Sequence, residues 1–437
     1  MSTGTSLPVY GKWPRVQAHG HSSIVIWLLE RAFDPLFATY VYFLVLLPSG
    51  SLFGVNVKII CFFLLLPLAL LKFADTRGIT LVHVAVLLAL PAVFLLWILI
   101  AQIYAFDTTL SLLQYKDIMT TFASCWLAAV YCGDKEATKV RFLRMVLFAE
   151  VIACLIKIAL LAYAFYKGIP VSLMVDAINT FFGVNLMGMD FEAALGRIQF
   201  VADGLIPLCM YMLLRYRRKL QIGSVGALIM FLLLVISLIF TFSRYFWGFA
   251  ALVFCLGMLF GKKDRFHAWI LSLLGLVLLA SLPAIVTLYQ LRFSKAIAGE
   301  SDNVRTQQIP VLERFFLDAP LLGHGFGSHT PELLRSIELP YAYEVQLYAL
   351  AGQEGIAGLL LMGALTLYYF RPLLVWNKAS FNRKGNLVII LFAWLSAGLF
   401  NPMLFNSAAA MSYAAISALA TIGDQPERAK TLSRHSG

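Results

Sequence analysis

Charged residues are scarce in this sequence. Asp, Glu, Lys and Arg together make up 13% of the 437 residues, whereas soluble globular domains contain roughly 25%. Hydrophobic residues make up 60% of the chain, and the mean hydropathy is +0.82. A chain with so little polar surface cannot cover a water-facing globule, so its solvent must be lipid. The composition therefore excludes an ordinary soluble protein.

Several chemical signatures are also absent. The sequence contains no Walker A motif, no dinucleotide fingerprint and no nucleophile elbow, which argues against an ATP-driven pump. No zinc-type spacing of cysteine and histidine occurs, so we expect no metal and no cofactor. The cysteines lie in or beside apolar runs rather than in long polar loops, which excludes a disulfide framework. The first apolar run lacks a small-residue cleavage site, so we expect no cleavable signal peptide. The six cysteines are Cys61, Cys125, Cys132, Cys154, Cys209 and Cys255.

What the sequence does contain is a series of long apolar runs. Their lengths of about 17–25 residues suit helices that cross a hydrocarbon core of roughly 30 Å. A membrane barrel would instead show alternating segments of about 10 residues. We therefore predict an all-α polytopic membrane protein with about 12 transmembrane helices. The expected spans are 33–48, 54–73, 79–105, 114–132, 143–166, 198–214, 222–242, 245–261, 267–290, 343–370, 386–402 and 405–421.

The basic residues indicate the orientation of these spans. In the twelve-span arrangement they concentrate in the loops on one side, for example in the run 215–219. The positive-inside rule assigns that side, together with both termini, to the cytoplasm. This bias also accounts for the net charge of +11 without a nucleic acid partner. The opposite side carries two longer segments, roughly 167–197 and 291–342.

Three arginines on the non-cytoplasmic side are candidate ligands for phosphate. They are Arg197 at the mouth of the sixth span, Arg244 on a minimal turn, and Arg305 in the second long segment. The planar guanidinium group matches two phosphate oxygens at once and stays charged. Each arginine could instead be a snorkelling or salt-bridged residue at the membrane surface. A turn between two apolar helices gives little reason to carry Arg244, which favours a functional role there.

Four further residues are candidates for proton chemistry or for structure. Glu344, at the start of the tenth span, is either a helix cap or a group placed to take a proton from a substrate hydroxyl. Glu354 lies roughly 15 Å deeper along a helix, as a structural partner or a second proton site. His324 and His329 flank a glycine-rich stretch. For both histidines we favour a structural role, as polar side chains on a tight turn, over an auxiliary catalytic role.

Two motifs resemble those of a known family. The stretch 318–328 reads DAPLLGHGFGS and is similar to the D-x-P-L-x-G-x-G-x-G-S segment of the O-antigen polymerase and O-antigen ligase superfamily. The stretch 355–358 reads GIAG and looks like the G-I-x-G motif of that superfamily. The turn that ends at Arg244 and the positions of Arg305 and Arg197 are also similar to the family pattern. The resemblance covers about residues 190–370.

One position departs from the family pattern. Many members, ligases especially, carry a His-Asn or similar pair about eleven residues before the G-I-x-G motif. In this sequence Glu344 stands there, in Tyr-Glu-Val. The resemblance implies that the histidine of ligases helps to activate the acceptor hydroxyl, and a carboxylate base could do the same. The substitution favours a polymerase or a divergent branch over a ligase.

The resemblance implies a metal-independent glycosyltransferase with a GT-C-like helical fold in the bacterial inner membrane. Its donor would be an undecaprenyl-diphosphate-linked glycan, and its acceptor another lipid-linked repeat unit or lipid A–core. The active site would face the periplasm, and other proteins of polysaccharide assembly would be partners. The three arginines would bind the diphosphate, and Glu344 would act as the base. The expected parts of the chain are N-terminal membrane helices (1–190), a catalytic region with the long periplasmic loop 291–342 (191–370), and C-terminal helices with a cytoplasmic tail (371–437).

Three alternatives remain open at this stage. The chain could be an O-antigen ligase that acts on lipid A–core, or a protein O-oligosaccharyltransferase of the same superfamily. It could also be a transporter of lipid-linked glycans without catalytic activity. Carriers usually show repeat symmetry and broken helices near the membrane midplane. Here the candidate charges gather at one face, which disfavours transport.

Overall fold

The computed structural model describes residues 23–47, 51–53, 55–77, 81–182, 186–190, 196–276, 295–333, 339–376 and 381–423. The first half contains the helices α1 (Ser23–Leu46), α2 (Val57–Arg77), α3 (Leu81–Ile103), α4 (Thr108–Cys132), α5 (Glu136–Lys167) and α6 (Val171–Phe182). Two short antiparallel hairpins pair β1 (Ser51–Leu52) with β2 (Val55–Asn56), and β3 (Met187–Asp190) with β4 (Gly196–Gln199).

The second half continues with a 3-10 turn at Val201–Gly204, α7 (Leu205–Tyr216), α8 (Ser224–Ile239), α9 (Arg244–Phe260) and a helix at Arg265–Leu276. The last helices are α11 (Lys295–Asp318), α12 (Gln346–Tyr369), α13 (Arg371–Leu374), α14 (Phe381–Leu395) and α15 (Ser407–Thr421), with a 3-10 turn at Ser396–Leu399.

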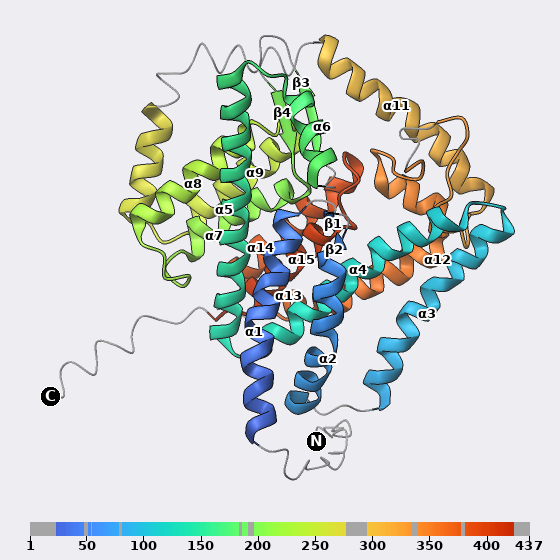
Figure 1. Cartoon of the computed structure of the whole chain (residues 1–437), viewed down its shortest axis with the longest axis horizontal. Helices are drawn as coiled ribbons and strands as arrows, with labels where there is room; N and C mark the ends of the chain where they lie inside the picture. The colour runs from blue at the N-terminus through green and yellow to red at the C-terminus, as the bar shows by residue number, and fades with distance from the viewer. Residues whose placement is uncertain are drawn as a thin grey trace, which may run out of the picture.

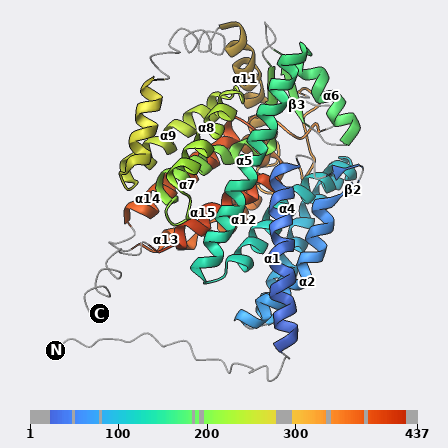
Figure 2. The ribbon, with the colours of Figure 1, turned by 60° about the vertical axis from the view of Figure 1, so that its left-hand side comes forward.

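Helix α15 lies in the middle of the bundle (Figures 1 and 2). It packs against α1, α4, α5, α7 and α14. Small side chains make this close packing of helices feasible, since they let neighbouring backbones approach. Helix α15 carries seven buried alanines: Ala408, Ala409, Ala410, Ala414, Ala415, Ala418 and Ala420. Helix α15 thus lies at the centre of the bundle, and helices from the N-terminal half pack around it.

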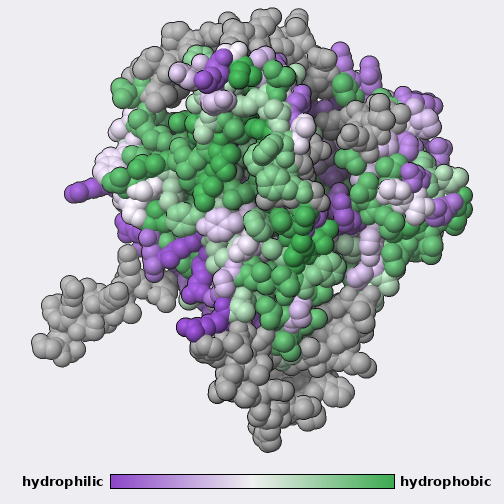
Figure 3. Space-filling model, in the orientation of Figure 1, coloured by the Kyte–Doolittle hydropathy of each residue, from purple (hydrophilic) through white to green (hydrophobic). Residues whose placement is uncertain are grey.

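The helices fit a protein that lies in a membrane. A helix overlaps each of the twelve apolar runs predicted as spans. Among the described helices, three are long and apolar enough to cross a bilayer by length and composition: Val57–Ala74, Glu136–Lys167 and Gln346–Tyr369. Hydrophobic side chains cover much of the face that includes α5 (Figure 3). The chain is therefore an all-α membrane protein, and the number of twelve spans stays a prediction.

The two longer segments are more structured than loops. The segment 167–197 contains α6 and the β3–β4 hairpin, and the segment 291–342 contains the 24-residue helix α11. Helix α11 is mostly polar, but Gln308, Leu312 and Phe315 are buried. Their spacing of four and three residues places them on one helical face. That face packs against α12, so the polar segment lies beside a membrane helix.

Helix α12 is broken near its middle. Gly355 has a φ of 62° and a ψ of −171°, which interrupts the helical hydrogen bonds. A side chain at Gly355 would place its Cβ 2.5 Å from the carbonyl oxygen of Leu321, so only glycine fits there. The interruption leaves backbone donors and acceptors of α12 without their usual partners in the helix.

The glycine-rich stretch supplies those partners. We call residues 320–328 together with residues 352–357 of α12 the glycine joint. Gly325 has a φ of 90°, and a Cβ there would lie 2.2 Å from the backbone nitrogen of Ala101, so the stretch also packs directly on α3. The hydrogen bonds across the joint are His324 N to Gly352 O (3.0 Å), Gly325 N to Gln353 O (2.8 Å), Ile356 N to Pro320 O (2.9 Å), Ala357 N to Leu321 O (3.0 Å) and Trp97 Nε1 to Glu354 O (3.0 Å).

Candidate active site

Two of the predicted site residues form an ion pair. Arg305 on α11 places Nε 3.1 Å from Oε2 of Glu344, which lies just before α12. The Nε–H does not point at the oxygen well enough for a hydrogen bond, so the contact is electrostatic. The side chains are 21% and 18% exposed. They are therefore reachable by a ligand while the surrounding protein holds them.

Neighbouring groups fix the geometry of this pair. Gln308, one turn after Arg305 on α11, accepts a hydrogen bond from the backbone nitrogen of Glu344 at 3.0 Å. The other end of Arg305 contacts Phe400. Its Nη2 donates to the Phe400 carbonyl oxygen at 3.3 Å, and the guanidinium carbon lies 5.8 Å from the ring centroid. Helix α11, the start of α12 and the residue after the 3-10 turn Ser396–Leu399 therefore meet at Arg305.

The same phenylalanine connects this pair with the helix that carries Arg244. Tyr245, the next residue, stacks on Phe400 with 5.7 Å between ring centroids and an interplanar angle of 28°. Arg244 itself is the first residue of α9 and is partly buried. The structure thus places Arg244 and Arg305 on elements that both contact Phe400.

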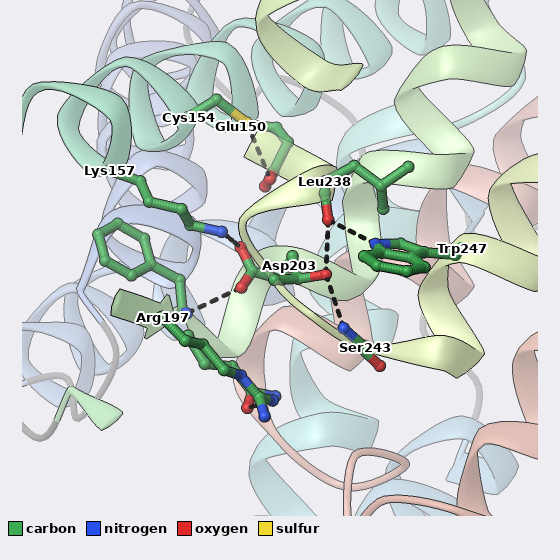
Figure 4. Close-up of polar contacts among 11 residues, drawn as sticks. Glu150, Cys154, Lys157, Arg197, Asp203, Leu238, Ser243 and Trp247 are labelled. Carbon is green, nitrogen blue, oxygen red and sulfur yellow. Dashed lines mark hydrogen bonds and ion pairs between the residues drawn. The ribbon is translucent and has the colours of Figure 1, made fainter. Parts of the chain in front are cut away.

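A tight turn holds the start of α9 in place (Figure 4). Ser243 caps the helix by accepting a hydrogen bond from Phe246 N. The Thr241 hydroxyl donates to the Leu238 carbonyl oxygen at 2.7 Å, and the Trp247 indole donates to the same oxygen at 3.0 Å. These bonds supply donors for a carbonyl oxygen at the end of α8. They also fix the position at which Arg244 begins the next helix.

Arg197 comes from a different element, the β3–β4 hairpin. It lies on β4 opposite Met189 of β3, and its guanidinium donates to the side chain of Gln199. Its positive charge also acts on the carboxylate of Asp203 in the 3-10 turn that follows. Arg197 therefore lies at the edge of a second, buried polar cluster.

This cluster is built from Lys157, Asp203 and Glu150 (Figure 4). Lys157 of α5 forms an ion pair with Asp203, and both side chains are buried. The second oxygen of Asp203 accepts a hydrogen bond from Phe200 N at 3.0 Å, which fixes the turn after β4. Glu150 is fully buried two turns away on α5 and accepts a hydrogen bond from the Cys154 thiol at 3.7 Å. The cluster ties the Arg197 strand to the membrane helix α5.

Helix α14 connects the two regions. Gly204, at the end of the 3-10 turn, lies so close to Trp394 that a Cβ would approach its ring to 2.6 Å. The hydroxyl of Tyr245 on α9 donates to the carbonyl oxygen of Ala393, the neighbouring residue of α14. The Arg197 region and the start of α9 therefore both rest on one turn of α14, which leads to Phe400.

Of the other three predicted residues, His324 and Glu354 belong to the glycine joint, and His329 directly follows its first stretch. His324 is stacked on Phe315 at 4.1 Å, and its Nδ1 lies 3.2 Å from the Gly352 carbonyl oxygen. His329 places Nδ1 3.1 Å from the Gly327 carbonyl oxygen. Glu354 is fully buried beside Gly358 at the break of α12. All three contact structural elements of the joint.

The joint also supports Glu344. The Gln353 amide donates to the carbonyl oxygens of Ser328 and Tyr341, at 3.0 and 3.2 Å. The hydroxyl of Tyr343 accepts a hydrogen bond from Thr330 N at 2.9 Å. These bonds hold in place the residues that lead into Glu344. The glycine motif therefore positions Glu344 through the residues that precede it in the chain.

Some residues of the site were not among the sequence candidates. Lys157 and Asp203 were overlooked although a charge within an apolar run is itself a signal of function or pairing. Gln308 and Phe400 carry no signal in sequence, because their roles depend on contacts between distant elements. Within the described residues, no group of three His, Cys, Asp or Glu side chains is arranged to hold a metal ion.

Comparisons with known proteins identify one region of the chain. Residues 229–363 match the sequence model of the O-antigen ligase family. Neither among curated proteins nor among solved structures was a match to this chain found. The matched region includes Arg244, Arg305 and Glu344, whereas Arg197 precedes it. This domain at residues 229–363 supports the resemblance to the O-antigen polymerase and O-antigen ligase superfamily.

Proposed function

We propose that the chain is a membrane glycosyltransferase that transfers or polymerises undecaprenyl-diphosphate-linked oligosaccharide repeat units at the periplasmic face. The O-antigen ligase domain supports an activity in the assembly of surface polysaccharide. The observation that carries the proposal is the partly exposed ion pair of Arg305 and Glu344. The pair supports the proposal because a candidate phosphate-binding group and a candidate base lie 3.1 Å apart.

The reaction requires one bond to form and one to break. A hydroxyl oxygen of the acceptor attacks the anomeric carbon of the donor sugar. The bond from that carbon to the diphosphate oxygen breaks, and the lipid diphosphate leaves with the electron pair. Glu344 accepts the hydroxyl proton. The positive charge of the arginines stabilises the negative charge that develops on the leaving diphosphate.

The ion pair suggests how binding of the donor prepares the base. Without substrate, Arg305 neutralises Glu344. A diphosphate would compete for the guanidinium group, since arginine binds phosphate oxygens in a bidentate manner. When Arg305 turns to the phosphate, its positive charge acts less on the Glu344 carboxylate, which favours transfer of a proton to that carboxylate. Binding of the donor would then itself activate the base.

Arg244 and Arg197 complete the proposed diphosphate site. Arg244 begins α9 at the turn that contacts the Phe400 region, so it can meet the same diphosphate as Arg305. Arg197 lies on the hairpin that rests on the same turn of α14 through Gly204. The lipid chain of the donor would lie between the membrane helices, which accounts for an enzyme with so much apolar surface.

The decisive assay uses purified protein and a lipid-diphosphate-linked oligosaccharide, without nucleotide or added metal. A ladder of products from the donor alone would establish a polymerase. Transfer only after lipid A–core is added would establish a ligase, and transfer only to an added acceptor protein would establish an oligosaccharyltransferase. Bound donor without any transfer would contradict the proposal.

Matched substitutions then test the roles of the ion pair. Glu344→Gln is expected to lower turnover about 10²–10⁴-fold, the usual contribution of a general base. Arg305→Ala is expected to lower turnover by about 10²-fold or more through lost stabilisation of the leaving group. The controls are Glu313→Gln and Arg314→Ala, exposed residues on the same α11 helix. Normal turnover of Glu344→Gln at wild-type expression would remove Glu344 from the mechanism.

A further inference from the structure

Three phenylalanines expose their rings far from the Arg305–Glu344 pair in the sequence. Phe53 is 64% exposed, Phe181 70% and Phe182 37%. Their ring centroids lie 6.1 Å apart for Phe53 and Phe181, 5.6 Å for Phe53 and Phe182, and 4.9 Å for Phe181 and Phe182. We call these residues the phenylalanine cluster. In water, such a contiguous apolar surface marks an interaction site.

The backbone at Phe53 is also unusual. Its φ is 50°, in the left-handed region where a side chain on an L-residue costs about 1–2 kcal/mol. Its N–H donates to the carbonyl oxygen of Phe182 at 2.9 Å, which joins the β1–β2 turn to the end of α6. Glycine would adopt this conformation without strain. A phenylalanine at such a strained position indicates that its side chain has a functional role.

The position of the cluster in the fold points to lipid. Phe53 lies at the tip of the hairpin that joins α1 to α2, and α2 can cross a membrane by length and composition. The exposed residues Ile59, Ile60 and Phe63 continue the apolar surface from the hairpin along α2. The cluster therefore lies where the chain turns back into the bilayer, at the membrane–water boundary. Aromatic side chains are favoured at that depth.

A rigid connection leads from the cluster to Arg197. The Asp190 carboxylate on β3 accepts hydrogen bonds from the backbone nitrogens of Val171 (2.6 Å) and Ser172 (3.2 Å) at the start of α6. Val171 also packs directly on Gly196, where a Cβ would approach its side chain to 2.1 Å. Gly196 precedes Arg197 on β4. Helix α6 thus links the phenylalanine cluster at its end to the arginine strand at its start.

We propose that the phenylalanine cluster inserts into the lipid headgroup boundary and holds the α6 and β3–β4 unit at a fixed depth against the bilayer. The occupant of this surface is the lipid bilayer itself. For donor binding, which rests on the proposed function, the consequence is that Arg197 is kept at the level of a lipid-linked diphosphate.

Nitroxide labels in proteoliposomes test the position of the cluster directly. The background is Cys255→Ser, which removes the exposed cysteine; the other five cysteines are buried. One label is placed at Phe181→Cys. The matched control is Thr180→Cys, an exposed neighbour that points about 100° away around the helix. Power saturation compares collisions with oxygen, which dissolves in lipid, and with a nickel chelate, which stays in water.

We expect a higher oxygen-to-nickel ratio at position 181 than at position 180. Adding Phe53→Gly, which relieves the positive φ and removes the ring, should lower the ratio at position 181. Equal collision rates at both positions, with nickel collisions dominant, would overturn the proposal. Shielding of position 181 from both reagents would also overturn it, because it would indicate a contact with protein. These readings do not depend on catalysis. If they hold while the enzyme assay fails, only the proposed function is lost.

Discussion

At the scale of single residues, the most consequential feature is the buried pair of Lys157 and Asp203. Neither residue contacts the Arg305–Glu344 pair, yet together they fix the turn behind Arg197. Removing a charge from water is costly, and the cost is recovered only while the partner is present. The pair therefore holds the Arg197 strand in place as long as it is intact.

This reasoning predicts the outcome of a double-mutant cycle. Lys157→Met and Asp203→Asn should each destabilise the folded protein by about 3–5 kcal/mol, because each removes the ion-pair partner of a buried charge. The double variant should be more stable than either single variant. Denaturant titration of the purified protein in detergent measures these differences. Additive losses in the double variant would show that the two residues act independently.

A second charged group, Asp264, governs the response to acid at the predicted cytoplasmic face. Burial raises its pKa, but hydrogen bonds from His267 and Arg217 outweigh this effect and lower the pKa from 3.8 to about 2. The folded state therefore gains stability from this carboxylate at pH values above 3.8. That gain is lost as the pH falls through 3.8 toward 2.

Asp264→Asn should consequently reduce the dependence of stability on pH. Between about pH 5 and pH 3, the melting temperature of the wild-type protein should fall more steeply than that of the variant. Differential scanning fluorimetry in detergent measures both profiles. Parallel profiles would mean that other carboxyl groups account for the acid sensitivity.

At the scale of elements, the glycine joint explains why two separate motifs occur together. The stretch 320–328 supplies the hydrogen-bond partners that α12 lacks around its break at Gly355. Because backbone groups in a membrane must be satisfied within the protein, neither motif is stable without the other. The joint thus gives a structural reason for motifs that the sequence alone linked only to a family.

Two glycines of α12 provide a matched test of the joint. Gly355→Ala requires an L-residue at a φ of 62° and a Cβ 2.5 Å from the Leu321 carbonyl oxygen. It should destabilise the protein by more than about 1–3 kcal/mol, the usual cost of such a conformation. Gly363→Ala lies in open space on the same helix and should be neutral or stabilising by up to about 1 kcal/mol. Thermal unfolding that ranks both variants equally would refute the role of the joint.

The apolar helices could be predicted from sequence, and the other elements could not. Hydropathy located a helix at each apolar run, since the bilayer dictates the length of a crossing helix. It overlooked α11, whose buried face holds Gln308, Leu312 and Phe315 among polar residues. Arg305 and Glu344 could be nominated from their chemistry. Their pairing could not, because it depends on how α11 packs against α12.

At the scale of the whole molecule, the arrangement separates two polar zones. The Arg217–Asp264 ion pair and its basic neighbours lie at the ends of α7 and α9, whereas Arg244 begins α9 and the Arg305–Glu344 pair joins α11 to the start of α12. Figure 3 shows hydrophilic side chains at the lower left edge and along the upper right, with hydrophobic surface between them. Such a distribution is expected when a bilayer surrounds the middle of the protein.

The predicted orientation can be tested with cysteines at the two zones. In the Cys255→Ser background, Lys263→Cys should react with a membrane-impermeant maleimide only after the inner membrane is opened. Glu332→Cys should react in intact spheroplasts. Both positions are exposed in the structure. Labelling of both from the same side would contradict the twelve-span arrangement with cytoplasmic termini.

The glycine joint also has a consequence for how the protein is made. The Trp97 indole donates to the carbonyl oxygen of Glu354, which is 257 residues further along the chain. During synthesis, α3 is therefore complete long before the acceptor of this hydrogen bond exists. A chain that stops before residue 352 lacks the carbonyl oxygens that accept hydrogen bonds from His324 N and Gly325 N. Closure of the joint is thus a late step of folding, which a truncated chain cannot complete.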